Sequence, residues 1–195
     1  MERTKLSIGY KRLAVAGVII TAVTAVASIA LLLRSSPPQP PAAEPAGQLQ
    51  WAANPQPAAA TPFTDASGAT HTLADFAGRV LVVNFWATWC APCVKEMPTL
   101  DALQAQLGGD GFAVVAVSQD SNASLAQTFL DKHGWQHLPF YADPGDHFTR
   151  DAGLRGLPTS IVVDRQGREV ARLEGGAVWN SPEMIADLRK VMATP

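Results

Sequence analysis

The sequence predicts an α/β domain that follows one long apolar segment. A continuous, largely β-branched run at 80–85 is typical of a buried strand. Directly after it, apolar residues recur at helical spacing through 94–107. Far upstream, residues 13–33 contain no charged side chain. An alternation of strands and helices after such a run indicates a membrane-anchored α/β protein.

The N-terminal run predicts one transmembrane helix. Residues 13–33 are long enough to cross about 30 Å of hydrocarbon as a helix. Four basic residues against one acidic residue in 1–12 place that end in the cytoplasm, so the domain lies on the outer side. A cleaved signal peptide is the alternative, because Ala25 and Ala27 fit an A-x-A site. The apolar run continues to Leu33, which favours an uncleaved anchor.

Residues 34–60 are expected to form a linker. From Ser35 onward this stretch is rich in Pro, Ala and Gln, and its composition favours an extended tether without a core. Leu49 and Trp51 would either dock on the domain or the membrane, or stay in a free linker, and we expect the free linker. The domain is then 61–195, which is large enough to bury a core. The chain carries a net charge of −2, and no basic patch points to nucleic acid.

The elements of the domain follow from turn and capping signals. Strands, short helices and turns are expected in this order: a hairpin of 62–64 and 69–72, a helical turn at 73–77, the strand 80–85, the helix through 94–107, a strand at 112–117, a helix at 121–133, a strand at 138–141, a helix at 146–152, a hairpin of 159–163 and 169–173, and a helix from Ser181 to Met192. In the helix at 121–133, Leu125, Phe129 and Leu130 are expected to point inward.

The only two cysteines, Cys90 and Cys93, stand two residues apart where the strand meets the helix. A helix N-terminus favours a thiolate, so Cys90 is the expected nucleophile and Cys93 the resolving thiol. Pro92 fits the first helical turn. C-x-x-C is also half of a zinc site or an inert disulfide, but no second pair exists, and only His133 and His137 form a loose histidine pair. Redox chemistry or thiol-based metal transfer is therefore favoured.

Three features together resemble one family. Trp89-Cys90-Ala91-Pro92-Cys93 lies between strand and helix, with Pro98 five residues further on; Gly156-Leu157-Pro158-Thr159 precedes an apolar strand; and Glu96 follows the second cysteine. In these features the chain resembles the membrane-anchored thioredoxin-like thiol:disulfide oxidoreductases of the TlpA/ResA/CcmG (DsbE) group. The resemblance covers roughly Thr61 to Pro195.

This resemblance implies a thioredoxin fold: a central mixed sheet flanked by helices, with an N-terminal hairpin and a central strand-helix insert. It implies that Pro158 is cis and that the backbone of Leu157 pairs with an extended partner segment. An apolar collar around Cys90 would then bind a partner protein, and it would consist of Trp89, Ala91, Pro92, Leu157 and Pro158. Arg155, Asp120 and Trp179 are candidates for the same surface or ordinary surface and packing residues.

Glu96 matches a carboxylate that the family carries near its cysteines, whereas Asn84 stands where thioredoxin has a buried Asp. Glu96 is therefore the better candidate for proton exchange with Cys93. A solvated carboxylate on the helix face is the alternative reading of Glu96.

The family implies a protein-disulfide reductase that needs no cofactor and no bound metal. Its domain would lie in the periplasm of a bacterium, tethered to the inner membrane, and a membrane donor of the DsbD/CcdA type would supply electrons. Partners would be disulfide-bearing proteins of cytochrome oxidase copper-site assembly, as for TlpA, or of cytochrome c biogenesis, as for ResA and CcmG. The segment 173–179 looks closer to TlpA.

Three other functions are weighed. The dithiol would bind Cu(I) as a metallochaperone, since thiolates favour this soft ion, although the cysteine spacing departs from Sco-type proteins and His137 or His147 would have to assist. A DsbA-type oxidant needs a stabilising group between the cysteines, and Ala91 and Pro92 offer none. Peroxide reduction would need Thr at position 87, which is Ala87. A reductant is the favoured function.

Overall fold

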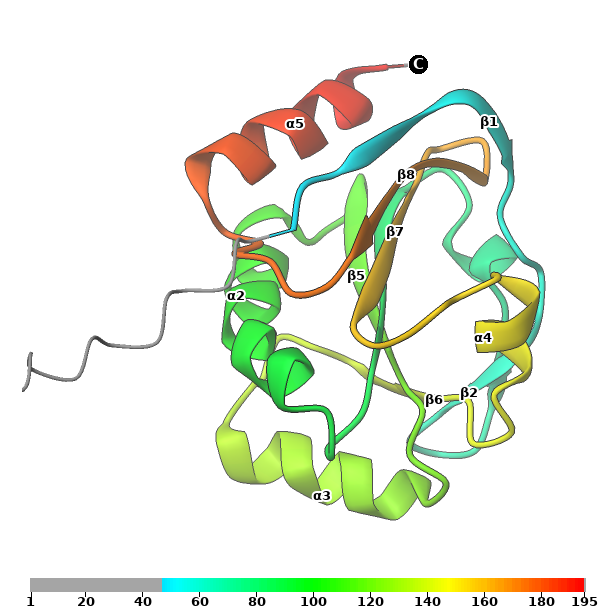
Figure 1. Ribbon diagram of the computed structural model, residues 1–195, viewed down its shortest axis with the longest axis vertical. Helices are drawn as coiled ribbons and strands as arrows, with labels where there is room; N and C mark the ends of the chain where they lie inside the picture. Colours follow the sequence, from blue (N-terminus) through cyan, green and yellow to red (C-terminus); the bar gives the residue numbers. More distant parts are fainter. Residues whose placement is uncertain (1–46, 195) are drawn as a thin grey trace, which may run out of the picture. The chain divides into compact units, whose positions relative to one another are not determined.

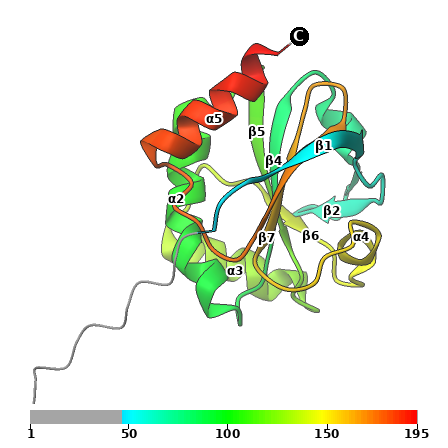
Figure 2. The ribbon, with the colours of Figure 1, turned by 45° about the horizontal axis from the view of Figure 1, so that its top comes forward.

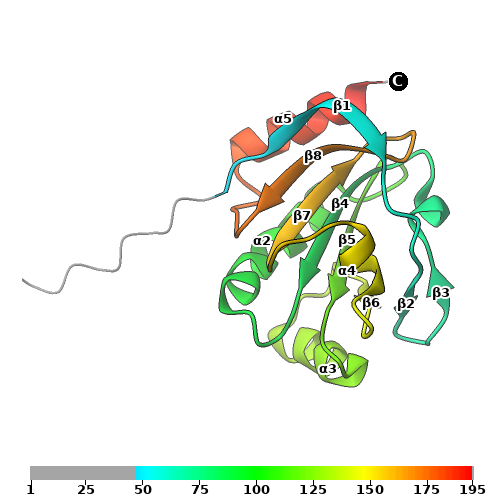
Figure 3. The same cartoon turned by 45° about the vertical axis from the view of Figure 1, so that its right-hand side comes forward.

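The computed structural model describes residues 47–194. The expected cytoplasmic end, the anchor and the linker up to residue 46 lie outside the described residues. Within 47–194, no helix combines the length and apolar character needed to cross a membrane. The described residues are built on an eight-stranded mixed sheet in the order β1-β8-β7-β4-β5-β6-β2-β3 (Figures 1 and 3).

Three buried strands form the centre of the sheet. β4 (Val80–Trp86) pairs in parallel with β5 (Phe112–Ser118) and antiparallel with β7 (Thr159–Val163). All residues of these three strands are buried, which explains why their sequences read as continuous apolar runs. This register sets Asn84 opposite Ser160.

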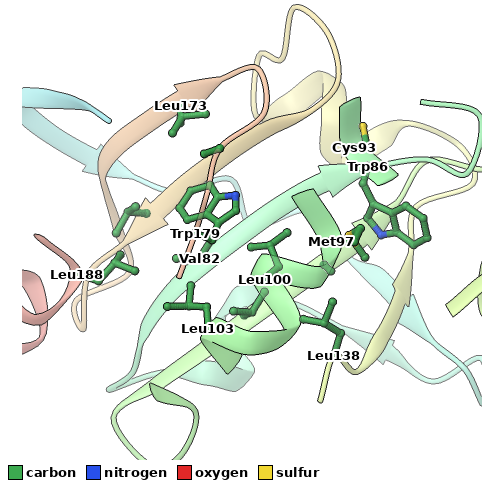
Figure 4. Close-up of a cluster of buried hydrophobic side chains, with 14 of the residues drawn as sticks. Val82, Trp86, Cys93, Met97, Leu100, Leu103, Leu138, Leu173, Trp179 and Leu188 are labelled. Atoms are coloured by element: carbon green, nitrogen blue, oxygen red, sulfur yellow. The ribbon is translucent and has the colours of Figure 1, made fainter. Parts of the chain in front are cut away.

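Helices cover both faces of the sheet. α2 (Ala91–Leu107), α3 (Ala123–His133) and α5 (Pro182–Ala193) pack on the face that carries Val80, Val82 and Trp86. Figure 4 shows Met97, Leu100 and Leu103 of α2 gathered against this face. The 3₁₀ helix η1 (Leu73–Phe76) and α4 (His147–Asp151) cover the opposite face, which carries Leu81, Val83 and Phe85. The alternation along β4 thus feeds two cores.

The remaining strands lie toward the edges. β8 (Arg168–Glu174) pairs with β7, β6 (Phe140–Ala142) pairs with β5, and β2 (Phe63–Asp65) joins the hairpin strand β3 (Thr70–His71) to β6. The expected hairpins, strands and helices are confirmed to within a few residues. The expected α/β class, a mixed sheet flanked by helices, is confirmed.

The expected linker boundary needs a correction. β1 (Gln50–Pro57) lies inside the range 34–60 and pairs antiparallel with β8 (Figure 2). Leu49 packs against the core that contains Leu173, so it is not part of a free linker. The sequence of β1 shows no alternation of apolar and polar residues, because nearly all its side chains are exposed. The strand forms through backbone pairing rather than through side-chain burial. The domain therefore begins before Thr61.

The inward orientation of Leu125 was also wrong. Leu125 is 61% exposed, whereas Ala126 and Leu130 are buried and Phe129 packs against the core. Residues 126 and 130 are one turn apart and share a face, and Leu125 lies about 100° away from Ala126 around the helix. The small Ala126 therefore faces the core, although the larger and more apolar Leu125 is the residue that the sequence pattern favoured.

Candidate active site

Cys90 caps the N-terminus of α2. The two cysteine sulfurs are joined in a disulfide with Cα atoms 5.3 Å apart, and the backbone N–H of Cys93 donates to Cys90 Sγ at 3.3 Å. Pro92 lies in the first turn, where no backbone donor is lost from the helix. The same N–H and the positive end of the 17-residue helix would stabilise a Cys90 thiolate after reduction.

The two sulfurs differ in access. Cys93 is fully buried, Cys90 retains 6% exposure, and the neighbouring Trp89 side chain is 70% exposed. Figure 4 shows Cys93 among the buried side chains of the core cluster, near the labelled Trp86. Ala91 and Pro92 are exposed. A partner would therefore meet Cys90 first, while Cys93 lies behind it.

Asp120 holds the loop that leads into Cys90. Its carboxylate accepts from the backbone N–H of Thr88 at 3.0 Å and from the Thr88 hydroxyl at 2.6 Å. Ser118 Oγ donates to the same carboxylate at 2.8 Å. Asp120 is buried. Its burial and its hydrogen bonds to Thr88 and Ser118 agree with the alternative that Asp120 is a packing residue.

The loop before β7 faces the same region. The Leu157–Pro158 peptide is cis, as expected. Pro158 is buried and Leu157 half-buried, packed against the core that includes Cys90. Within residues 47–194, the backbone N–H and C=O of Leu157 take part in no hydrogen bond. The unpaired N–H and C=O of one residue can both form hydrogen bonds with an extended partner segment, as between two strands. The partner-binding role of the collar residues stays a prediction.

Glu96 lies in a closed polar site behind the cysteines. It is 3% exposed and accepts from Asn84 Nδ2 at 2.8 Å, from the Ala177 backbone N–H at 2.9 Å and from Trp179 Nε1 at 3.0 Å. The solvated alternative for Glu96 was therefore wrong. Residues three apart on a helix share a face, which puts Glu96 on the side of Cys93. Trp179 is fully buried and holds Glu96, so it is no part of an exposed surface.

Burial raises the pKa of Glu96 above that of an ordinary carboxyl group, because the charged form loses its hydration. The hydrogen bonds from Ala177, Asn84 and Trp179 oppose this rise without cancelling it. A buried carboxyl group with a raised pKa can hold a proton closer to neutral pH than an exposed one. This is the property that proton exchange with a thiol requires.

Ser160 belongs to this polar site and was missed from the sequence. Its Oγ accepts from Asn84 Nδ2 at 2.9 Å across the β4–β7 pair. A polar residue in the apolar run of 159–163 was a signal, but its partner became clear only with the strand register. Ser160 and Glu96 share the amide of Asn84, which fixes the orientation of that side chain.

A groove of about 360 Å³ opens beside Trp89, the residue before Cys90. Trp89 forms one wall, and Leu157 with the loop before it forms another. Gln119, which follows β5, completes the groove together with Arg150 and other side chains of the α4 region. Sequence reasoning named Trp89, Leu157 and Arg155 of this groove and missed the contribution of α4. Within the described part of the chain, no group of three or more His, Cys, Asp or Glu side chains is placed to hold a metal ion.

Comparison with known proteins agrees with this geometry. A family model described as Redoxin matches residues 51–191. The thiol:disulfide interchange protein HelX of Rhodobacter capsulatus is 39% identical over 117 residues, covering 60% of each chain. The thiol-disulfide oxidoreductase ResA of Bacillus anthracis is 32% identical over 112 residues, covering 57% of this chain and 64% of ResA. The chain thus spans a little over half the length of these curated relatives.

Solved structures show the same fold. A structure from Chlorobium tepidum, assigned as a thiol:disulfide interchange protein DsbE, superposes with a TM-score of 0.65 at 27% identity and covers 71% of this chain and 97% of its own. A DsbF homologue from Corynebacterium diphtheriae superposes with a TM-score of 0.60 at 25% identity, covering 74% and 96%. The resemblance to the group that contains ResA and DsbE, expected from the sequence, is confirmed.

Proposed function

The chain belongs to the Redoxin family, and on this premise we propose that it is a protein-disulfide reductase that works through the Cys90–Cys93 pair. The observation that carries the proposal is the position of Cys90: it caps α2, retains 6% exposure and follows the exposed Trp89, which lines a groove together with Leu157 of the cis-Pro158 loop. A nucleophilic thiol, a protected second thiol and an adjacent unpaired backbone are what disulfide exchange with a protein needs.

The proposed reaction has two exchange steps. The Cys90 thiolate attacks one sulfur of the partner's disulfide, so that a Cys90–partner disulfide forms and the other partner sulfur leaves as a thiolate. The Cys93 thiolate then attacks Cys90 Sγ, which forms the internal disulfide and releases the second partner sulfur. The partner gains two electrons and the Cys90–Cys93 pair loses two.

Glu96 is proposed to take the proton of Cys93 before the second step. Its burial on the Cys93 side of α2 and its raised pKa support this role. Asn84, Trp179 and the backbone of Ala177 act as positioning groups, because they touch Glu96 and not the reacting sulfurs.

The setting is also a proposal. We expect the domain in the periplasm, tethered by residues 13–33 to the inner membrane and reduced by a membrane donor of the DsbD/CcdA type. Likeness to ResA favours apocytochrome c as the partner, whereas the segment 173–179 favoured copper-site proteins. Mixed disulfides trapped on a Cys93→Ser chain and identified by mass spectrometry would distinguish these two partner classes.

The reduction potential tests the direction of the reaction. It is measured in glutathione and dithiothreitol buffers, with Cys90→Ser as the control without an internal disulfide. A potential near about −270 mV, as in thioredoxin, or well below about −180 mV supports a reductase. A potential near about −120 mV, as in DsbA, would instead make the protein an oxidant of exported proteins.

A further inference from the structure

The groove that Trp89, the residue before Cys90, lines together with Arg150, Arg155 and Leu157 carries an excess of positive charge. We call it the α4 groove. Arg150 and Arg155 are the two basic residues of the lining, and Asp146 is its single acidic residue. Within residues 47–194, no carboxylate lies within ion-pair distance of either guanidinium. Arg150 is held by the Gly145 carbonyl at 2.8 Å and by His147 Nδ1 at 3.0 Å, whereas Arg155 is exposed.

The positive charge of this groove is opposite in sign to the net charge of the rest of the domain. Five of the fifteen basic residues and two of the seventeen acidic residues lie before residue 47, which leaves ten basic and fifteen acidic residues in the rest. Two arginines in the groove that Trp89 lines are therefore an exception on an acidic domain. Since guanidinium groups bind carboxylates in a two-point geometry, the groove fits an acidic side chain.

Buried and partly buried hydrogen bonds fix the walls of the α4 groove. The Asp143 carboxylate accepts from the backbone N–H groups of His147, Phe148 and Thr149 at 3.0, 2.9 and 3.2 Å. Thr149 Oγ1 also donates to Gln119 Oε1. Arg150 follows directly on this anchored turn of α4. The groove is thus held open and charged before any partner arrives, which reduces the ordering cost of binding.

We propose that the α4 groove binds an acidic side chain of the partner segment whose cysteine reacts with Cys90, two positions away from that cysteine. This inference rests on the proposed function. A segment paired with the Leu157 backbone is extended, so residues two positions apart point to the same side and lie about 7 Å apart. Trp89 precedes Cys90 in the chain and lines the groove together with Leu157, so a segment that pairs with Leu157 while its cysteine reacts with Cys90 would pass along the groove.

The test uses the full chain with Cys93→Ser, in which exchange stops after the first step. Short peptides carry one cysteine as a mixed disulfide with thionitrobenzoate, and Glu, Gln or Lys stands two positions before or after it. Attack by the Cys90 thiolate forms the Cys90–peptide disulfide and releases thionitrobenzoate, whose absorbance gives the rate. Peptides with the same substitutions one position away are the positional control.

We expect Glu at one of the two second positions to react roughly tenfold faster than Lys at low salt, with a ratio that shrinks as salt is added. Arg155→Gln should remove most of this ratio and Arg155→Lys should retain part of it. Arg189→Gln on α5 changes the net charge equally but lies outside the groove, so it should leave the ratio unchanged.

Equal rates for the Glu, Gln and Lys peptides would overturn the inference and leave the proposed function standing. The same holds for a Glu preference that survives Arg155→Gln, or one that Arg189→Gln removes equally. Release from none of the peptides would overturn the proposed function, and the inference with it.

Discussion

The side-chain amide of Asn84, at the centre of β4, donates to the carboxylate of Glu96 in α2 at 2.8 Å. This hydrogen bond joins β4, in the middle of the sheet, to the helix that Cys90 caps. Asn84 stands where thioredoxin has a buried Asp, so this position carries a neutral hydrogen-bond donor in this chain. The acidic group is supplied by Glu96 of α2 instead. The acid of the site therefore lies in the helix that Cys90 caps and that contains Cys93.

Glu96→Gln should slow the attack of Cys93 on the mixed disulfide, because Gln cannot accept the thiol proton. We expect a loss of roughly a hundredfold at neutral pH, the lower range for general acid-base catalysis. Single-turnover reduction of a disulfide peptide measures this step across pH. Glu183→Gln, in the exposed first turn of α5, is the matched control. Superimposable pH profiles for Glu96→Gln and the natural chain would exclude the proton role.

The same variant should change how stability depends on pH. The folded pKa of Glu96 is raised above 4.5, so its contribution is fully present below about pH 4.5 and is lost as pH rises through the folded pKa. The natural chain should lose unfolding free energy over that range, and Glu96→Gln should lose less. Urea unfolding at a series of pH values measures the difference, and parallel curves would contradict the expectation.

Asp120→Ala should destabilise the domain by about 2 kcal/mol, since it leaves Thr88 and Ser118 without their charged acceptor. The loop before Cys90 should also become less ordered, so the reaction of Cys90 should slow. Urea unfolding and the rate of peptide exchange check the two effects. Asp110→Ala removes an exposed carboxylate and is the control. If both variants unfold at the same urea concentration, Asp120 has no such role.

The hairpin of β2 and β3 should respond to pH through His71. Its Nε2 lies 3.0 Å from Asp65 and its Nδ1 lies 3.4 Å from Asp75. The hydrogen bond with Asp65 raises the pKa of His71, and hydrogen bonds from Ser67 and His71 lower the pKa of Asp65. The histidine contribution is full below pH 6.5 and is lost as pH rises through its folded pKa. The Asp65 contribution is present above pH 3.8 and is lost on acidification.

Both contributions therefore overlap between about pH 4 and 6.5. The melting temperature of the natural chain should fall between pH 6 and 8, and His71→Gln should reduce that fall. Melting followed by circular dichroism across this range is the measurement. His133→Gln, which replaces an exposed histidine of α3, is the control, and its melting temperature should change with pH as that of the natural chain does.

A fragment that begins at Thr61 should be less stable than one that begins at Pro45. It loses the pairing of β1 with β8 and the packing of the half-buried Leu49, and half-burying one leucine contributes about 1 kcal/mol. Urea unfolding of the two fragments compares them directly. Equal stability would mean that β1 is only an attachment to the edge.

Much of this architecture could be predicted because local and global signals agree. The apolar run of β4, the proline in the first turn of α2 and the Ser181 cap of α5 each determine their element locally. β1 could not be predicted, because its stabilising partners are backbone groups of β8, more than 100 residues later. The cysteines were found from spacing alone. The surroundings of Glu96 were not, because Ala177 and Trp179 reach it from about 80 residues away.

The start of the described chain also has a mechanical consequence. The backbone N–H of Gly47 donates to the Gly176 carbonyl at 2.9 Å, and Ala177, the next residue, donates to Glu96. Tension applied to the chain ahead of Gly47 would load this contact before it reaches the sheet. The peptide unit between Gly176 and Ala177 would therefore carry the load between Gly47, which its carbonyl binds, and Glu96, which its N–H binds.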